Sequence, residues 1–577
     1  MPHRRLPSAS PPEPMSPLVA ISRRLAPADR HDRLAWGLFA AVALLVVATF
    51  RDYGITWDEE VQNIYGGLVL NYYLSGLKDT ACNSFFDLFY YGGGFDLLAA
   101  AANRVSPFGE YETRHLLNGL IGVLGLIGTW RLGRLLGGPR AGLLAALLLV
   151  SVPYWYGQMF NNPKDIPFAA ATVWALGYMA EAAGRLPGVP WRIGMKLGLC
   201  IGLALGVRVG GFLLFFYAAA AVGLVALVRA ALHRRPGLLL AEGMAGGLRL
   251  LLPAVLVAWP VMLLLWPWAQ LDPIGNPLYA LLRFSAIPHR VPMLFGGEVV
   301  LSDRLPLSYV PTHLLLRLPE AMLLALAAAL PAAALALRRW LRGEAAGWRD
   351  PAAWGRAAVL GLGIGFPIFY VIAIDAVLFD GIRHLTFVLP PLAVLAALAL
   401  DRLVAALPPG RAPRAAFAAL GAAVAVQAGL MMRLHPHQYV YFNSLAGGTG
   451  RAELSYELDY WANSYREAVA GLESRLRAEH GERFDRMIFH VAVCGPALSA
   501  SYYFPANFVL EPAVERADFL VAFTRFNCHL RHGGQEFVRV ERADALLSAV
   551  VDLRADAVDL ARSPRARRPQ AVQKRRG

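Results

Sequence analysis

The sequence predicts a polytopic α-helical membrane protein, with about eleven transmembrane helices and a small C-terminal extracytoplasmic α/β domain. Hydrophobic residues make up 56% of the 577 residues and charged residues only 17%, with a mean hydropathy of +0.44. Such a composition leaves too little polar surface for a soluble protein of this size. Apolar stretches long enough to cross a bilayer recur between residues 34 and 432, whereas the remaining chain has a soluble composition.

The chain begins with a Pro-, Ser- and Arg-rich segment, residues 1–33, for which we expect a disordered, basic, cytoplasmic N-terminus. No small-residue cleavage site follows the first apolar run, so that run is interpreted as a membrane helix and not as a cleaved signal peptide. The membrane module then covers residues 34–432. The expected spans are 34–50, 115–134, 141–160, 166–183, 194–207, 211–228, 250–268, 313–337, 357–374, 384–404 and 415–432.

The net charge of +14 does not indicate nucleic-acid binding, because the basic residues form short clusters between apolar spans. With a cytoplasmic N-terminus, these clusters fall mostly on the cytoplasmic side, as the positive-inside rule requires. Two long loops, 51–114 and 269–312, and the C-terminal domain then lie outside the inner (plasma) membrane. This orientation depends on the two short spans around Arg208, since loss of either would reverse the topology downstream.

The first long loop also has apolar residues at helical spacing, namely Trp57, Val61, Ile64 and Leu68. A helix with such a stripe suits the bilayer surface. We therefore expect interfacial helices in this loop.

The extracytoplasmic domain is expected over residues 433–560, with an amphipathic helix near 465–480 and strands at the apolar runs 487–493 and 519–523. Cys494 and Cys528 lie just beyond these runs. If the strands are adjacent and parallel, the sulfurs come close, and a disulfide is permitted outside the cytoplasm. Residues 561–577 are expected to be a disordered basic tail, whose role the sequence leaves open.

Acidic residues follow the first span almost immediately, as Asp58, Glu59 and Glu60. Thr56 and Glu59 have the spacing of a capping box, so a purely structural role at a helix N-terminus is the first alternative. A second acid, Asp165, lies in the short outer loop between the third and fourth spans, where it could equally be a helix cap. The topology nevertheless places both acids on the same face of the membrane.

Basic residues occur at a similar depth. Arg208 interrupts an apolar hairpin, Arg383 and His384 begin the tenth span, and Lys164 precedes Asp165. A guanidinium near hydrocarbon is costly, which makes it a candidate functional group, although a structural ion pair is the alternative. For Arg283, His289 and Arg290 in the second long loop, solvation is the simpler interpretation.

Carboxylates beside cations at a bilayer surface suit sugar transfer from a lipid-linked phosphate to an acceptor hydroxyl. The transition state resembles an oxocarbenium ion, negative charge grows on the departing phosphate, and the hydroxyl loses a proton. An Asp can accept that proton, while Arg or Lys stabilises the phosphate. The sequence has no nucleotide-binding glycine loop, no His/Cys cluster of zinc spacing and no nucleophile elbow.

These residues resemble the bacterial protein-mannosyltransferase-like glycosyltransferases (glycosyltransferase family 39 type) of the GT-C superfamily, which are related to the lipid A aminoarabinose transferases. The motifs that carry the resemblance are Asp58-Glu59, Asn162-Pro163-Lys164-Asp165-Ile166-Pro167-Phe168, Leu294-Phe295-Gly296-Gly297, Leu305-Pro306, Arg383-His384 and His435-Pro436-His437-Gln438-Tyr439-Val440-Tyr441-Phe442-Asn443. Each motif is short.

The resemblance implies a GT-C-like fold, a polyprenyl-phosphate sugar donor and an inverting displacement in a cavity that faces away from the cytoplasm. It implies that Asp58 is the general base, that Glu59 assists, and that Asp165 helps to place the acceptor or a metal. From depth and charge we assign Arg208, Arg383, Lys164 and His384 to the donor phosphate. The C-terminal domain differs from that of the eukaryotic protein mannosyltransferases, so the acceptor stays open among lipid, glycan and protein.

Neither the sugar nor a metal requirement follows from the sequence: no cofactor is demanded, although acids near a phosphate leave room for Mg²⁺ or Mn²⁺. A polytopic transporter or lipid flippase is the main alternative function, but the sequence shows no internal repeat of the kind that transporters often have. A non-catalytic membrane subunit is a third alternative, which would not explain carboxylates beside buried arginines.

Overall fold

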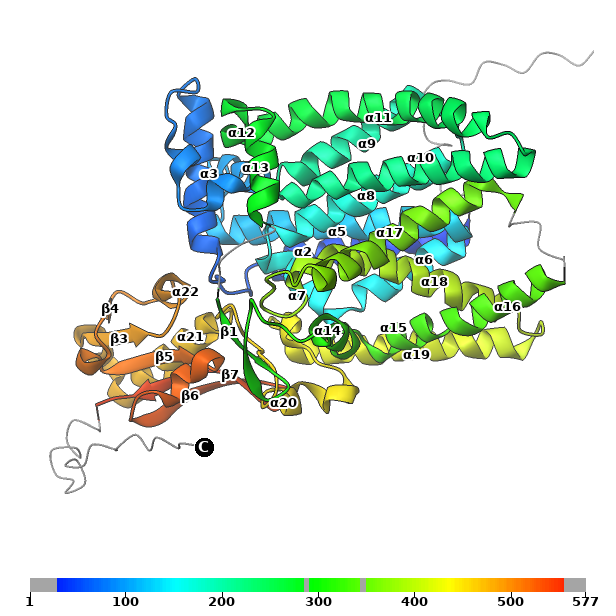
Figure 1. Ribbon diagram of the computed structural model, residues 1–577. Coiled ribbons are helices and arrows are strands. Elements are labelled where there is room, and N and C mark those ends of the chain that lie inside the picture. Colours follow the sequence, from blue (N-terminus) through cyan, green and yellow to red (C-terminus); the bar gives the residue numbers. More distant parts are fainter. Residues whose placement is uncertain (1–28, 285–289, 343–348, 555–577) are drawn as a thin grey trace, which may run out of the picture.

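The computed structural model describes residues 29–284, 290–342 and 349–554. Most of the N-terminal segment, His289 and the whole C-terminal tail from 561 lie outside these ranges. The described chain forms a long bundle of helices with a small sheet domain at one end (Figure 1).

A helix lies at every position where a span was expected. Eight helices of the described residues are long and apolar enough to cross a membrane, and a ninth crossing would be the pair α6 and α7, which is bent by 69°. The predicted helical membrane architecture is confirmed at this level, and the count of eleven remains a prediction. The helices of the bundle are α2 (Arg30–Thr49), α5 (Glu110–Gly137), α6 (Pro139–Val150), α7 (Pro153–Asn161), α8 (Asp165–Ala183), α9 (Trp191–Leu205), α10 (Phe212–His233), α11 (Gly237–Leu265), α15 (Glu320–Ala327), α16 (Ala329–Leu341), α17 (Pro351–Ala373), α18 (Leu389–Ala405) and α19 (Arg411–Leu434).

Helix α9 has only 15 residues, yet it packs closely along α11. Gly194, Gly198 and Gly202 form one small-residue face on α9, the pattern that lets membrane helices approach closely. A Cβ atom at Gly198 would lie 2.4 Å from the carbonyl oxygen of Ala254 on α11. The glycines therefore bring the two backbones into direct contact and fix the short helix in the bundle.

The first long loop contains α3 (Glu59–Leu74), the 3-10 turns η1 (Ala81–Ser84) and η2 (Leu88–Tyr90), and α4 (Gly94–Asn103). Helix α3 forms where the apolar spacing predicted a helix, although it begins after Trp57; Ile64 is exposed, and Tyr65, Val69 and Tyr72 are buried. The second long loop contributes α12 (Pro267–Leu271), α13 (Gly275–Phe284) and a hairpin of β1 (Pro292–Phe295) and β2 (Glu298–Leu301). Helix α14 (Tyr309–Arg317) follows it.

The C-terminal domain contains a five-stranded sheet in the order β4-β3-β5-β7-β6. Its central strands β3 (Phe489–Val493) and β5 (Phe519–Phe523) are parallel neighbours, and α21 (Tyr465–His480) packs against the sheet. The remaining elements are α20 (Gly448–Ala452), α22 (Ala497–Ser501), β4 (Phe508–Leu510), β6 (Gln535–Arg542) and β7 (Ala545–Asp552). Both long loops and this domain lie at the same end of the bundle (Figure 1). The side of the membrane that this end faces remains a prediction.

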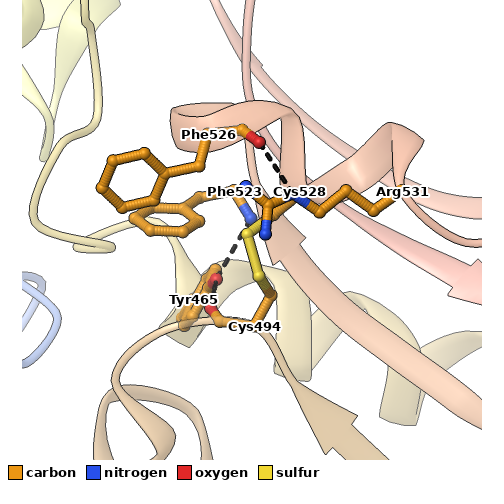
Figure 2. The surroundings of a disulfide bond; sticks show 6 residues. All are labelled: Tyr465, Cys494, Phe523, Phe526, Cys528 and Arg531. Atoms are coloured by element: carbon orange, nitrogen blue, oxygen red, sulfur yellow. Dashed lines mark hydrogen bonds between the residues drawn. A yellow bond between two sulfur atoms is a disulfide. The ribbon is translucent and has the colours of Figure 1, made fainter. Parts of the chain in front are cut away.

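A disulfide joins Cys494, just after β3, to Cys528, in the turn η10 (Arg525–Leu530) after β5. It is the pair that the sequence singled out, and the two Cα atoms are 6.2 Å apart. Figure 2 shows the surroundings: the Tyr465 hydroxyl lies beside the bond and accepts a hydrogen bond from the Phe523 N–H at 3.1 Å. Arg531 donates to the carbonyl of Phe526 at 2.9 Å within the same turn. The disulfide therefore ties η10 to the centre of the sheet.

The sheet domain docks on the segment that joins α2 to α3. The N–H of Gly54 donates to the Asn463 side chain at 2.6 Å, and the N–H of Trp57 donates to the carbonyl of Trp461 at 3.0 Å. A Cβ atom at Gly54 would lie 2.2 Å from the carbonyl oxygen of Asn463. This contact fixes the backbone immediately before Asp58.

Candidate functional site

Asp58 and Glu59 are adjacent in sequence but have different surroundings. Glu59 is fully buried, where its carboxylate accepts hydrogen bonds from the N–H and the hydroxyl of Thr56 at 2.8 and 2.9 Å. Its other oxygen lies 3.0 Å from Nε2 of His115. Glu59 thus makes the capping-box contact that the sequence suggested.

The Asp58 carboxylate instead lies 2.9 Å from Nη1 of Arg383, which the turn η5 (Arg383–Val388) supplies. The Asp58 side chain is 41% exposed, whereas that of Arg383 is only 10% exposed. Burial alone would raise the pKa of Asp58, but Arg383 and Lys164 outweigh it and hold that pKa below its usual value. Asp58 is therefore an ionised carboxylate that a molecule in solution can reach.

Asp165 begins α8 and forms the second ion pair of the site, with Arg208 at 2.6 Å. The Asp165 side chain is only 5% exposed. Asn162 accepts a hydrogen bond from the N–H of Asp165 at 2.9 Å and donates to its carboxylate at 2.7 Å. Asn162 therefore satisfies the helix N-terminus and binds one carboxylate oxygen of Asp165, while Arg208 contacts the other.

Lys164 is near both pairs, since the charges of Asp58, Arg208 and Arg383 act on it, and its Nζ is 4.1 Å from the centre of the Tyr91 ring. Within the described ranges it takes part in no salt bridge, unlike Arg208 and Arg383. Burial lowers the pKa of Lys164 to about 8, which the charges of Asp96 and Asp58 partly oppose. Among the described residues, the site thus offers an ammonium that no carboxylate pairs with and an accessible carboxylate, Asp58.

A third ion pair joins Asp96 of α4 to Arg114 of α5 at 2.6 Å, and both side chains are almost fully buried. The sequence did not draw attention to this pair. It is close to the site, because the charge of Asp96 raises the pKa of Lys164. Asp96 and Arg114 hold the first long loop on the bundle.

Asp380 and Arg525 were also missed. Asp380 lies 3.5 Å from Arg383 and 2.8 Å from Arg525, which comes from the C-terminal domain. Asp380 could have been found from its position three residues before Arg383. Nothing in the sequence connects Arg525 to either residue.

The remaining assigned residue, His384, packs edge-on against the ring of Phe379, with the centroids 4.7 Å apart. Of the cations that the sequence indicated in the second long loop, Arg290 pairs with Asp303 at 2.6 Å and Arg283 lies over the ring of Tyr90 at 5.1 Å. His289 lies outside the described residues.

The residues 435–443 serve to hold the domains together. His437 is buried and lies 3.0 Å from Glu467 of α21, while its other ring nitrogen contacts the Asn463 side chain at 2.9 Å. The Asn443 side chain donates to the carbonyls of Leu315 and Leu318 at 2.7 and 2.8 Å. This motif therefore fastens the bundle to the segment that docks beside Asp58.

The donor set does not fit a divalent cation. Asp58, Asp96, Asp165 and Asp380 each face a guanidinium, and no three His, Cys, Asp or Glu side chains lie together among the residues that the structure describes. A hard divalent cation would need several free oxygen ligands at one point. No step below depends on a metal.

Comparison with known proteins confirms the resemblance seen in the sequence. The model of the family "Dolichyl-phosphate-mannose-protein mannosyltransferase" matches residues 98–259. This range contains Lys164, Asp165 and Arg208 but not Asp58 or Arg383. No curated protein matches the chain.

The solved structures that match this chain are remote in sequence, and their TM-scores are below 0.5. ArnT from Cupriavidus metallidurans bound to undecaprenyl phosphate is 15% identical, with 89% of this chain and 97% of that chain covered and a TM-score of 0.43. The same protein in the apo state is 16% identical, with 90% and 98% covered and a TM-score of 0.45. The oligosaccharyltransferase AglB from Archaeoglobus fulgidus, in complex with an inhibitory peptide and a dolichol-phosphate, is 15% identical, with 86% and 70% covered and a TM-score of 0.45.

Proposed function

We propose that this protein is an inverting membrane glycosyltransferase that moves a sugar from a polyprenyl-phosphate donor to an acceptor hydroxyl on the extracytoplasmic side. The exposure of Asp58 carries the proposal. Four carboxylates of the site face guanidinium groups, but Asp165, Asp96 and Asp380 are nearly inaccessible, whereas 41% of the Asp58 side chain is exposed. The family match supports a donor in which the sugar is linked to a lipid phosphate.

In the proposed reaction, the acceptor oxygen attacks the anomeric carbon and the bond from that carbon to the phosphate oxygen breaks. The phosphate leaves with the bonding electron pair, and Asp58 accepts the proton of the hydroxyl. A carboxylate of low pKa suffices, because the phosphate is a good leaving group and the hydroxyl becomes acidic as its bond to carbon forms.

Lys164 is the best placed ligand for the phosphate, since it has no carboxylate partner among the described residues. Arg208, whose side chain is 22% exposed, is a second cation for the phosphate, but its guanidinium is also paired with Asp165. Arg383 contacts Asp58 and Asp380, and its main role is to orient the base. When the phosphate binds, it partly neutralises Lys164, which weakens one of the interactions that lower the pKa of Asp58 and makes it a better base.

The test has two stages. Mass spectrometry of lipids and envelope glycans from cells with and without the protein identifies the glycosylated product and hence the donor. The transfer rate is then measured in membranes for the wild type, Asp58→Asn and the control Asp87→Asn, an exposed carboxylate of the same loop. We expect Asp58→Asn to lose about 10²–10⁴-fold in rate with normal insertion, and full activity of this variant would refute the base assignment.

A further inference from the structure

The C-terminal domain contributes a charged group directly to the site. The Arg525 side chain is 6% exposed and its Nη2 lies 2.8 Å from Asp380. Its Nη1 donates to the carbonyl of Tyr460 at 2.9 Å. Asp380 in turn lies 3.5 Å from Arg383, which contacts Asp58 at 2.9 Å. Four alternating charges thus run from the sheet domain to the proposed base.

The backbone on both sides of this contact has unusual conformations. Asp380 has a φ of 59°, and Phe526 and Asn527, directly after Arg525, have φ values of 57° and 54°. Non-glycine residues rarely adopt such conformations, which persist where the surrounding structure holds them and which cluster at functional sites. The disulfide at Cys528 and the hydrogen bond from Arg531, just after η10, to the carbonyl of Phe526 hold this turn (Figure 2). Arg525 is the first residue of the same turn.

Removing Arg525 would change the partner of Arg383. One carboxylate oxygen of Asp380 lies 2.8 Å from Nη2 of Arg525, and the other lies 3.5 Å from Nη1 of Arg383. Without Arg525, the buried charge of Asp380 is balanced by Arg383 alone, which draws that guanidinium away from Asp58. A buried carboxylate with one partner removed strongly attracts the other.

We propose that Arg525 is a positioning residue of the transferase, held in place by the Cys494–Cys528 disulfide, which shares Asp380 with Arg383 and so keeps Arg383 on Asp58. The proposal rests on the proposed function. It makes the sheet domain part of the catalytic machinery, although Arg525 lies far outside the range that the family model matches.

The experiment compares Arg525→Gln, Arg525→Lys and the control Arg516→Gln, whose side chain is 77% exposed on the same domain. For Arg525→Gln we expect kcat to fall by about 10- to 100-fold, as for other losses of alignment, with the donor KM unchanged. Arg525→Lys retains the charge and should recover part of the rate. Addition of Asp380→Asn to Arg525→Gln removes the unbalanced charge and should raise kcat above that of the single variant.

A pH profile separates positioning from a general loss of structure. The cations that act on Asp58 are Arg383 from η5, Lys164 from the loop before α8 and Arg525 from η10, and each lowers its pKa. Asp58 works as the carboxylate, so activity falls as the pH drops through its pKa. Without Arg525 that pKa rises, and the acid limb of kcat/KM should move to higher pH.

The double variant Cys494→Ser/Cys528→Ser should show the same loss of kcat and the same shift. If the wild type transfers sugar and Asp58→Asn does not, but Arg525→Gln matches Arg516→Gln in kcat and pH profile, this inference is wrong while the proposed function stands. If Asp58→Asn is fully active, the proposed function itself fails. A disulfide variant with wild-type kcat would overturn the part assigned to the disulfide.

Discussion

Lys164 gives the sharpest quantitative test of how the site binds a phosphate. Its pKa of about 8 means that the side chain is charged at neutral pH but loses its proton in mildly alkaline solution. The proposed contact with a phosphate requires the ammonium form. We therefore expect the affinity for a polyprenyl phosphate to be highest below pH 8 and to fall as the pH rises through 8.

The size of the effect follows from that pKa. About nine tenths of the lysine is protonated at pH 7 and about one tenth at pH 9, so the affinity should fall about tenfold over this range. A phosphate monoester has its second pKa near 6, so the ligand itself does not titrate between pH 7 and 9. Removal of the charge-assisted hydrogen bond in Lys164→Met should weaken binding by about 1.5–3 kcal/mol, which is roughly 10- to 150-fold.

The assay is binding of undecaprenyl phosphate to the purified protein in detergent, measured between pH 7 and 9 for the wild type, Lys164→Met and Lys164→Arg. Lys164→Arg should bind with little pH dependence, because a guanidinium stays protonated throughout. If Lys164→Met keeps both the wild-type affinity and the tenfold decline, Lys164 does not bind the phosphate and the charge argument is wrong.

Two further predictions concern stability and topology. Arg114→Met should destabilise the protein by about 3–5 kcal/mol, because it leaves the Asp96 carboxylate buried without its partner. The double variant Asp96→Leu/Arg114→Met removes both charges and should have a melting temperature in detergent close to that of the wild type. Equal melting temperatures for the single and double variants would contradict this prediction. The topology can be tested by cysteine labelling in a Cys82→Ser/Cys200→Ser background. Leu454→Cys should react with an impermeant maleimide on intact cells, since position 454, beside the sheet domain, is 79% exposed. Arg402→Cys on α18 should react only after the membrane is permeabilised. The opposite pattern would invert the topology.

The helices were predictable because each needs only local information. A run of about 20 apolar residues must be helical in a bilayer to satisfy its own backbone. The two central strands and α21 were also predictable from local signals, namely short apolar runs for the strands and amphipathic spacing for the helix. The short helix α9 shows the limit of this reasoning, since its length alone does not justify a crossing and its glycine face acquires meaning only against α11.

The proximity of the candidate residues was predictable in part. Depth and charge indicated that Asp58, Asp165, Lys164, Arg208 and Arg383 lie near one another, which their ion pairs and electrostatic interactions bear out. Their roles remain a prediction. The different environments of Asp58 and Glu59 were not predictable, because neighbouring residues at a helix start project about 100° apart and only the docked partners decide which one is buried. Asp380 and Arg525 pair across 145 positions of sequence, and such a contact depends on how two domains dock.

The docking of the sheet domain on Gly54 also sets an order of events during biosynthesis. Asp58 leaves the ribosome before Asn463, Tyr460 and Arg525, which complete its surroundings. If the protein acts as proposed, the helical bundle can be inserted before the sheet domain has folded, but it should be unable to turn over a donor until then. A chain that stops before this domain would therefore not consume lipid-linked sugar.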